Sequence, residues 1–378
     1  MKRARALFRA PVPLCLCATL LASCGGPDAD APRAHVYIPR GSSLAAVADT
    51  LQAHGVIEAA WQFRWYGRAR GLARKVRPGL YAFPVGERWS VIVTALKTGR
   101  TDDISLTVPE GLTVREIAEL AASQLRLAKD SVQSAVRDSF LAAARDPVLL
   151  AELGITSRRG VREPAEGYLL PETYRIAYDS RIRDVVRRML KQFTELWDST
   201  FDRRAMALGL SKHQAVTLAS IVEAEAQVPV EHRRIAGVYL NRLRRRMLLQ
   251  ADPTVIYALD QPVRRVLYRH LEIRSPYNTY RYAGLPPGPI GNPGRSALEA
   301  AVEPERHGFF YFVARPDGRH MFSVTGRQHA DSVAVARVLR AAFEARRDSV
   351  QRGLLPDSAL RRPIAGGGGA RAPARARS

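Results

Sequence analysis

One predicted helix places two carboxylates at the end of an apolar run. Ser211 and Gln214 have the spacing of a capping box, which predicts that a helix begins there and continues to Glu225. Its apolar positions are Ala215, Leu218, Ile221 and Val222. Because burial disfavours the charged form of a carboxyl group, a glutamate beside such a run usually has a partner or a task. The segment therefore limits the fold and predicts a chemical site.

Glu223 and Glu225 lie two positions apart, so on a helix their side chains point roughly 200° from each other. They cannot both face one groove. Glu223 directly extends the apolar run 219–222, which makes it the better candidate for an acid and leaves Glu225 a supporting or solvated role. A helical glutamate is most often a solvated surface group, so this segment alone does not establish catalysis.

A polar segment follows, with Gln250, Asp252, Thr254 and Tyr257 close together in the chain. Asp252 precedes Pro253 and fits an N-cap followed by proline at the first helical position. A structural role for Asp252 is therefore favoured over acid catalysis. An acid beside amide and phenol side chains on stiff loops is typical of a groove in which sugars are cleaved.

The loop over residues 277–294 is rich in proline and glycine. Proline restricts such a loop, while glycine allows the backbone to come close to a ligand. Tyr277, Asn278 and Tyr280 offer ring faces and amide hydrogen bonds to sugars, and Pro287 and Asn292 belong to the same loop. A rigid loop that only packs on the core is the alternative.

The N-terminus is predicted to be an export signal. Four basic residues precede a short apolar run over residues 12–22, too short to span a bilayer. The run ends in Leu-Ala-Ser-Cys at 21–24, which resembles the lipobox of bacterial lipoproteins. By that resemblance residues 1–23 are a signal peptide, Cys24 is lipidated, and residues 24–34 form a tether. A signal with a chance cysteine is the alternative. No cysteine follows Cys24, so the mature chain has no thiol for a disulfide or a metal.

The formal net charge is +22, of which four positive charges lie in the signal and five arginines in the tail after residue 360. Removing these nine leaves +13, a surplus that attracts anionic polymers or membrane surfaces. For an exported lipoprotein, carboxylate-bearing wall peptides and anionic lipids are the expected partners, and nucleic acid is not. Residues 351–378 are predicted to be a disordered basic tail, because glycine, alanine, proline and arginine cannot form a core.

A repeat occupies the first third of the chain. Residues 36–48 align without gaps to residues 106–118, and each copy reads as a strand, a Pro-x-Gly turn, a Ser or Thr cap and an amphipathic helix. Thr113 and Glu116 have capping-box spacing. The first copy resembles the start of a LysM-type glycan-binding module, which predicts a LysM-like domain over residues 35–125. Two generic strand-helix units are the alternative.

Several motifs together resemble the endolytic murein transglycosylases, the MltG-like (YceG-like) family. They are Ile-Val-Glu-Ala-Glu at 221–225, Asn-Arg-Leu at 241–243, Leu-Gln-Ala-Asp-Pro-Thr-Val at 249–255, Ser-Pro-Tyr-Asn-Thr-Tyr at 275–280, and the glycine- and proline-rich run 284–294. Glu-Gly-Tyr-Leu-Leu-Pro-Glu-Thr-Tyr at 166–174, Gly-Arg-His-Met-Phe at 318–322 and His329 also resemble the family pattern. The resemblance covers residues 35–350, with the motifs in order.

The resemblance implies a lyase that cuts the β-1,4 bond between MurNAc and GlcNAc inside glycan strands. It would leave 1,6-anhydro ends, end the elongation of nascent strands, and need no cofactor or metal. Glu223 matches the family's catalytic glutamate, which would protonate the departing oxygen and then take the proton of the C6 hydroxyl. The expected substrate-binding residues are Gln250, Asp252, Thr254, Tyr257, Tyr277, Asn278, Tyr280, Pro287 and Asn292. Peptidoglycan strands and synthases of the penicillin-binding protein class are the expected partners.

Two further readings stay open: a non-catalytic glycan-binding scaffold for wall synthases, and a hydrolase that releases reducing ends. The family usually has an N-terminal transmembrane helix, in whose place this chain has the lipobox. The resemblance implies anchoring at the inner membrane, with the outer membrane as the alternative, since Gly25 differs from the aspartate that retains some lipoproteins at the inner membrane.

The predicted fold class is α+β. A small LysM-like domain precedes a mostly helical catalytic domain over residues 126–350. That domain is predicted to end in a β-hairpin, formed by residues 309–313 and 320–324, and a last helix that ends near Arg346.

Overall fold

The computed structural model describes residues 32–99, 101, 104–125, 133–156, 158–177, 180–259, 263, 266–356 and 358. The predicted signal, Cys24, most of the tether and most of the basic tail lie outside these residues. Within the described part of the chain, no helix is both long enough and apolar enough to cross a membrane.

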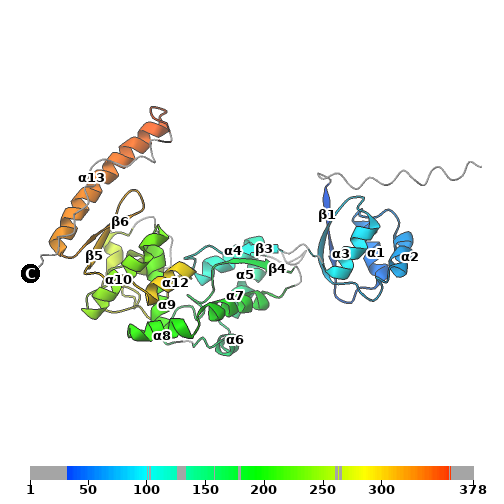
Figure 1. Cartoon of the computed structure of the whole chain (residues 1–378), viewed down its shortest axis with the longest axis horizontal. Coiled ribbons are helices and arrows are strands. Elements are labelled where there is room, and N and C mark those ends of the chain that lie inside the picture. Colours follow the sequence, from blue (N-terminus) through cyan, green and yellow to red (C-terminus); the bar gives the residue numbers. More distant parts are fainter. Residues whose placement is uncertain are drawn as a thin grey trace, which may run out of the picture. The chain divides into compact units, whose positions relative to one another are not determined.

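The chain divides into two compact units, and the smaller one comprises the described residues up to Ile104 together with Ala177. Its elements are β1 (Arg33–Ile38), α1 (Leu44–Ala53), α2 (Ala60–Ala69), β2 (Gly79–Pro84) and α3 (Trp89–Thr98). The two strands pair in antiparallel fashion, with Val36 opposite Tyr81. Figure 1 shows the three helices of this unit grouped together.

Alternating burial explains why this unit folds as it does. Along β2, alternate residues are buried, so one face of the strand pair is covered by apolar side chains. The Ser43 side chain accepts a hydrogen bond from the Ala46 amide at 3.1 Å and caps α1 as predicted. The core gathers Ile38, Leu51 and Phe63 from three different elements.

The second copy of the repeat belongs to the larger unit. The predicted capping box is confirmed: Thr113 and Glu116 bond each other's backbone amides at the start of α4 (Val114–Gln124). The strand of this copy, β3 (Ile104–Thr107), pairs with β4 (Thr173–Ile176), far along the chain. The division between the units consequently falls after Ile104, earlier than the predicted boundary at residue 125.

The larger unit is mostly helical, with two small strand pairs, so the α+β class is confirmed. Its further helices are α5 (Gln133–Ala144), α6 (Pro147–Glu152), α7 (Ile182–Leu196), α8 (Ser199–Ala207), α9 (Lys212–Glu225), α10 (His232–Arg244), α11 (Asp252–Leu259) and α12 (Arg295–Val302), with 3₁₀ turns η1 (Pro229–Glu231) and η2 (Tyr268–Glu272).

Helix α9 lies at the centre of this unit. Every residue from Ala215 to Val222 is buried, which is the pattern of a helix that is covered on all sides. Its neighbours are α12, α10, α11 and α8, and Figure 1 shows α9 near α8, α10 and α12. A carboxylate that follows this run is therefore held close to the protein interior.

The predicted hairpin and last helix are present. Strands β5 (Tyr311–Ala314) and β6 (His320–Ser323) pair in antiparallel fashion, with Tyr311 opposite Ser323. Helix α13 (Gly326–Gln351) contacts both strands and ends five residues beyond the predicted Arg346.

Candidate active site

The sequence fixes where α9 begins and ends. Ser211 accepts a hydrogen bond from the Gln214 amide at 3.3 Å, and the Gln214 side chain accepts from the Ser211 amide at 2.9 Å. This is the predicted capping box. The backbone becomes extended at Ala226, and Pro229 starts the next turn. Both glutamates therefore lie in the last turn, where their side chains reach different surroundings.

Glu223 lies against the loop before α12. Its Oε2 accepts a hydrogen bond from the Gly294 amide at 2.9 Å. Burial raises its pKa, and this hydrogen bond opposes the increase because it favours the charged form. Gly111 packs close to the Glu223 side chain. Burial and the negative charge of Glu223 raise the pKa of Glu110, a carboxyl group in the loop before α4.

Glu225 faces a different part of the unit. It lines a pocket of about 370 Å³, whose walls come from α9, α10, α11, the hairpin and α13. Its Oε1 accepts a hydrogen bond from the Tyr239 hydroxyl at 2.8 Å. Among the described residues, no group donates to Oε2. One oxygen is thus held in place while the other is free to meet a ligand.

Burial raises the pKa of Glu225 to about 7. The Tyr239 hydrogen bond and the charge of Arg242 oppose this increase, while the charge of Asp252 adds to it. A carboxyl group with a pKa near 7 holds a proton in part of the molecules at neutral pH and can take it back after donating it. That property is what a general acid and base requires.

Three of the predicted binding residues line the pocket of Glu225, namely Gln250, Asp252 and Tyr280. The Tyr280 hydroxyl donates to Asp252 Oδ1 at 2.5 Å. Gln250 has a left-handed backbone (φ 48°), which is unfavourable for a residue with a side chain and recurs at functional sites. Helix α11 begins at Asp252, one residue before the predicted start at Pro253, so Asp252 is its first residue and not the residue before it.

Arg242 forms part of the wall of this pocket. Its guanidinium donates to the carbonyl oxygens of Phe310 at 2.6 Å and of Leu249 at 2.8 Å. It thereby ties the hairpin to the segment that carries Gln250. The side chain is buried and lies over the ring of Tyr311.

Other predicted binding residues are engaged in holding loops. The Thr254 hydroxyl donates to the Ala251 carbonyl at 2.7 Å and is buried. The buried Asn278 amide donates to the carbonyls of Leu271 and Ile273, both at 2.9 Å. These contacts explain why this segment has Thr and Asn, and they leave little of either side chain for a ligand.

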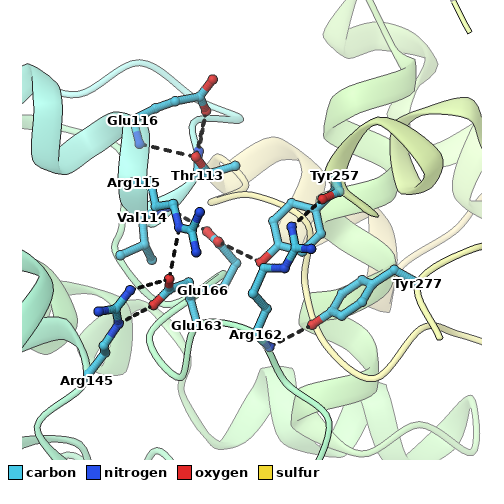
Figure 2. A network of polar contacts seen from close by, with 10 residues as sticks. All are labelled: Thr113, Val114, Arg115, Glu116, Arg145, Arg162, Glu163, Glu166, Tyr257 and Tyr277. Atoms are coloured by element: carbon cyan, nitrogen blue, oxygen red, sulfur yellow. Dashed lines mark hydrogen bonds and ion pairs between the residues drawn. The ribbon is translucent and has the colours of Figure 1, made fainter. Parts of the chain in front are cut away.

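Tyr257 and Tyr277 belong to a buried polar network around Glu166 (Figure 2). Asn292 also bonds Glu166. Glu166 accepts hydrogen bonds from the Val114 amide at 2.9 Å, the Asn292 amide group at 3.1 Å and the Tyr257 hydroxyl at 3.1 Å. Burial raises the pKa of Glu166 to about 8. The network connects α4, α11 and the 292 loop.

A second carboxylate of the network is paired with arginines. Glu163 lies 2.7 Å from Arg145 and 3.1 Å from Arg115, as Figure 2 shows. Burial would raise the pKa of Glu163, but its hydrogen bonds with these two arginines hold the pKa below its usual value. In the same view the Tyr277 hydroxyl accepts from the Arg162 amide at 3.2 Å.

Pro287 lies elsewhere, beside His213. The carbonyl oxygen of Pro287 accepts from His213 Nε2 at 2.7 Å, and both residues line a pocket of about 490 Å³. The Tyr168 hydroxyl lies 2.9 Å from His213 Nδ1. The predicted site residues therefore divide among several places, and the pocket of Glu225 contains a helix glutamate together with three of the predicted binding residues.

Sequence reasoning missed several groups in the pocket of Glu225. Tyr239 and Arg242 come from α10, and His320 and His329 come from the C-terminal hairpin and helix. The motif at 318–322 and His329 signalled that this region matters, but not which glutamate it faces. Among the residues that the structure describes, no cluster of His, Cys, Asp and Glu could hold a metal ion.

The chain is similar to several known proteins. It is 35% identical over 298 residues to the endolytic murein transglycosylase of Bacillus subtilis (strain 168), covering 78% of this chain and 82% of the relative. It is 29% identical over 325 residues to the endolytic murein transglycosylase of Streptococcus pneumoniae (strain ATCC BAA-255 / R6), covering 79% of this chain and 57% of that protein.

A solved structure gives the same picture of the fold. The crystal structure of a YceG-like protein from Listeria monocytogenes matches with a TM-score of 0.56 and 31% identity, covering 79% of this chain and 98% of that one. The family model described as the YceG-like family matches residues 36–335. On these matches, the chain belongs to the YceG-like family.

Proposed function

We propose that this protein is an endolytic murein transglycosylase whose active site is the pocket of Glu225. The names of the relatives from Bacillus and Streptococcus support the activity. The observation that carries the site is a carboxyl group with a pKa near 7, with one oxygen held by Tyr239, in a pocket lined by predicted binding residues. The substrate is the β-1,4 bond between MurNAc and GlcNAc within a glycan strand.

The proposed chemistry needs one acid. Protonated Glu225 gives its proton to the glycosidic oxygen as the bond from that oxygen to C1 breaks. The C6 hydroxyl of the same MurNAc then attacks C1 and forms the 1,6-anhydro ring. Its proton passes to the Glu225 carboxylate, which restores the acid. Most glycosidases use two carboxylates, one of which activates water or forms a covalent bond with the sugar, and here the internal hydroxyl replaces that step.

Glu223, the sequence-based candidate, stays the alternative acid. Its carboxylate accepts a hydrogen bond from the Gly294 amide at 2.9 Å, just as Glu225 accepts one from Tyr239, so this contact does not separate the two acids. Gln250 and Tyr280, which were predicted to orient the glycan, line the pocket of the other glutamate. This difference favours Glu225.

The pocket offers polar groups of several kinds to a sugar. We assign glycan binding to Gln250, Tyr280 and Asp252, whose carboxylate also raises the pKa of Glu225. Thr254, Asn278, Tyr257, Tyr277 and Asn292 are assigned to the support of the surrounding loops, on the strength of their hydrogen bonds. For Pro287, a glycan contact remains a proposal.

We further propose that the small unit is a LysM-like glycan-binding module. Trp61 and Trp65 lie one turn apart on α2, and their side chains are 59% and 69% exposed. Exposed indole rings can stack on the apolar faces of sugars. Removing both rings in the variant Trp61→Ala/Trp65→Ala is expected to weaken co-sedimentation with insoluble peptidoglycan, and unchanged co-sedimentation of a folded variant would reject this role.

A lipid anchor at Cys24 and a partnership with wall synthases complete the proposal. The lipobox-like sequence 21–24 supports the anchor, and the inner membrane is the expected location, where nascent strands are made. Mature protein found only in the soluble periplasmic fraction would reject the anchor. Copurification with a synthase of the penicillin-binding protein class would support the partnership.

The products distinguish the proposed activity from its alternatives. Mass spectrometry of uncrosslinked glycan strands incubated with the mature protein is expected to show shorter strands with 1,6-anhydro ends. Shorter strands with reducing ends would indicate a hydrolase. Strands of unchanged length that nevertheless bind the protein would indicate a scaffold.

A further inference from the structure

Glu231 and His320 form a hydrogen-bonded pair in the wall of the Glu225 pocket. His320 Nδ1 lies 2.7 Å from Glu231 Oε2, and the His320 backbone amide donates to Glu231 Oε1 at 3.2 Å. The imidazole ring packs against the rings of Phe312 and Phe322, and the His320 side chain is only 3% exposed. The ring is therefore held in one orientation.

This pairing fixes which ring nitrogen carries the proton in the neutral imidazole. A carboxylate only accepts hydrogen bonds, so the nitrogen beside Glu231 must be the donor. Nδ1 then carries the hydrogen, and Nε2 has a lone pair. His320 Nε2 is thus a hydrogen-bond acceptor, on a ring whose Nδ1 is bonded to Glu231.

Nε2 of His320 is open to the pocket. Among the described residues, no group forms a hydrogen bond with this nitrogen. The nitrogen is also not fully buried, so a ligand can reach it. His320 lines the same pocket of about 370 Å³ as Glu225, Asp252 and Tyr280. A ligand that fills this pocket meets the Glu225 carboxyl group and the Nε2 lone pair together.

We propose that His320 binds the substrate by accepting a hydrogen bond from the N–H of a 2-acetamido group, that of the sugar whose bond is cleaved. This inference rests on the proposed function. In that chemistry Glu225 serves the glycosidic oxygen and the C6 hydroxyl, which leaves the acetamide N–H as the donor next to C1. A donor taken out of water needs an acceptor. The hydrogen bond fixes the acetamide beside the reacting carbon.

The substitution Glu231→Gln tests the role of Nε2 with little change of shape. The Gln oxygen can still accept from the His320 amide, and its NH₂ group can donate to Nδ1. Nδ1 then becomes the acceptor, and Nε2 carries the hydrogen. The acetamide N–H would face a donor in place of an acceptor, so the acetamide is no longer recognised.

Binding is measured in the Glu225→Gln background, where strands are not cut. The probes are a GlcNAc–MurNAc tetrasaccharide, called the acetylated probe, and its counterpart in which 2-O-acetyl esters replace the acetamides and so remove only the N–H donors. The acetylated probe is expected to bind about tenfold more tightly, a preference of the size that one buried hydrogen bond provides. Glu231→Gln is expected to remove most of this preference. A folded Glu231→Gln variant that keeps the full preference would overturn the proposal, as would loss of the preference in Asp252→Asn and not in Glu231→Gln.

A second measurement needs no change to the pair. In protein labelled with ¹⁵N-histidine, Nε2 of His320 should have the chemical shift of an unprotonated nitrogen, and the acetylated probe alone should move it. A protonated Nε2 in the neutral ring would refute the assignment. Cleavage by the wild-type protein separates the role of His320 from the proposed transglycosylase chemistry. If the wild type cleaves strands and Glu231→Gln keeps the preference for the acetylated probe, only the role of His320 is rejected. If Glu231→Gln loses this preference but the wild type does not cleave strands, only the proposed transglycosylase chemistry is rejected.

Discussion

The hydrogen bond from Tyr239 to Glu225 allows the pH dependence of the activity to be predicted quantitatively. Glu225 must be protonated to donate, so activity should fall as the pH rises through its pKa of about 7. One pH unit above that value, each further unit should cost about tenfold in rate. The Tyr239 hydroxyl bonds the carboxyl group at 2.8 Å and favours its charged form. The substitution Tyr239→Phe should therefore raise the pKa and extend activity to higher pH.

The size of this shift follows from the hydrogen bond. A hydrogen bond to a charged group contributes about 1.5–3 kcal/mol, and one pKa unit corresponds to about 1.4 kcal/mol. The alkaline limb should therefore move upward by about one to two units. Phenylalanine keeps the ring, which packs edge-on against Phe312 with centroids 5.8 Å apart, so the pocket wall is preserved.

The assay is the rate of 1,6-anhydro end formation from pH 5 to 9, measured for the wild type and Tyr239→Phe. Thermal unfolding of both proteins serves as the control for folding. A folded variant whose alkaline limb stays in place, or moves to lower pH, would refute the reasoning that Glu225 is the titrating acid.

Three further predictions concern the surroundings of the site. Asp252→Asn removes a charge that raises the pKa of Glu225, so the alkaline limb should move to lower pH, opposite to Tyr239→Phe; an upward shift would contradict this. Glu166 has a folded pKa of about 8, above its unfolded value, so its contribution to stability is complete below pH 4.5 and is lost as the pH rises toward 8. Between pH 6 and 8 the free energy of unfolding should fall by about 2 kcal/mol because of this group. Glu166→Gln should remove this pH dependence from chemical denaturation curves, and identical pH dependence of both proteins would contradict the prediction. Gly167→Ala should lower the free energy of unfolding by about 2 kcal/mol or more, because φ is +84° and the added Cβ would lie 2.5 Å from Pro289 Cγ and 2.8 Å from Val216 Cγ1; an unaltered midpoint would contradict it.

Local signals predicted the elements that depend on neighbouring residues. The caps at Ser43, Thr113 and Ser211 are where the spacing of side chains indicated. The hairpin before α13 was also predicted, because turn residues separate two apolar runs. In each case the decisive hydrogen bonds join residues that are near in sequence, so a single segment contains the information.

Contacts between distant segments could not be predicted. Strand β3 pairs with β4, and Glu166 bonds the start of α4, through residues that no local pattern connects. The surroundings of the two helix glutamates are a case of this kind. The helical period showed that Glu223 and Glu225 point apart, but the partners of each come from α10, the 294 loop and the hairpin. Which glutamate lines the pocket is decided by tertiary packing.

The direct test of the central claim compares Glu225→Gln with Glu223→Gln on uncrosslinked glycan strands. Each substitution keeps the shape of the side chain and removes its acid, so each variant is the matched control for the other. The account predicts that 1,6-anhydro ends form with the wild type and Glu223→Gln, and that Glu225→Gln forms almost none. Full activity of Glu225→Gln, with loss of activity in a folded Glu223→Gln, would contradict it and place the acid at Glu223.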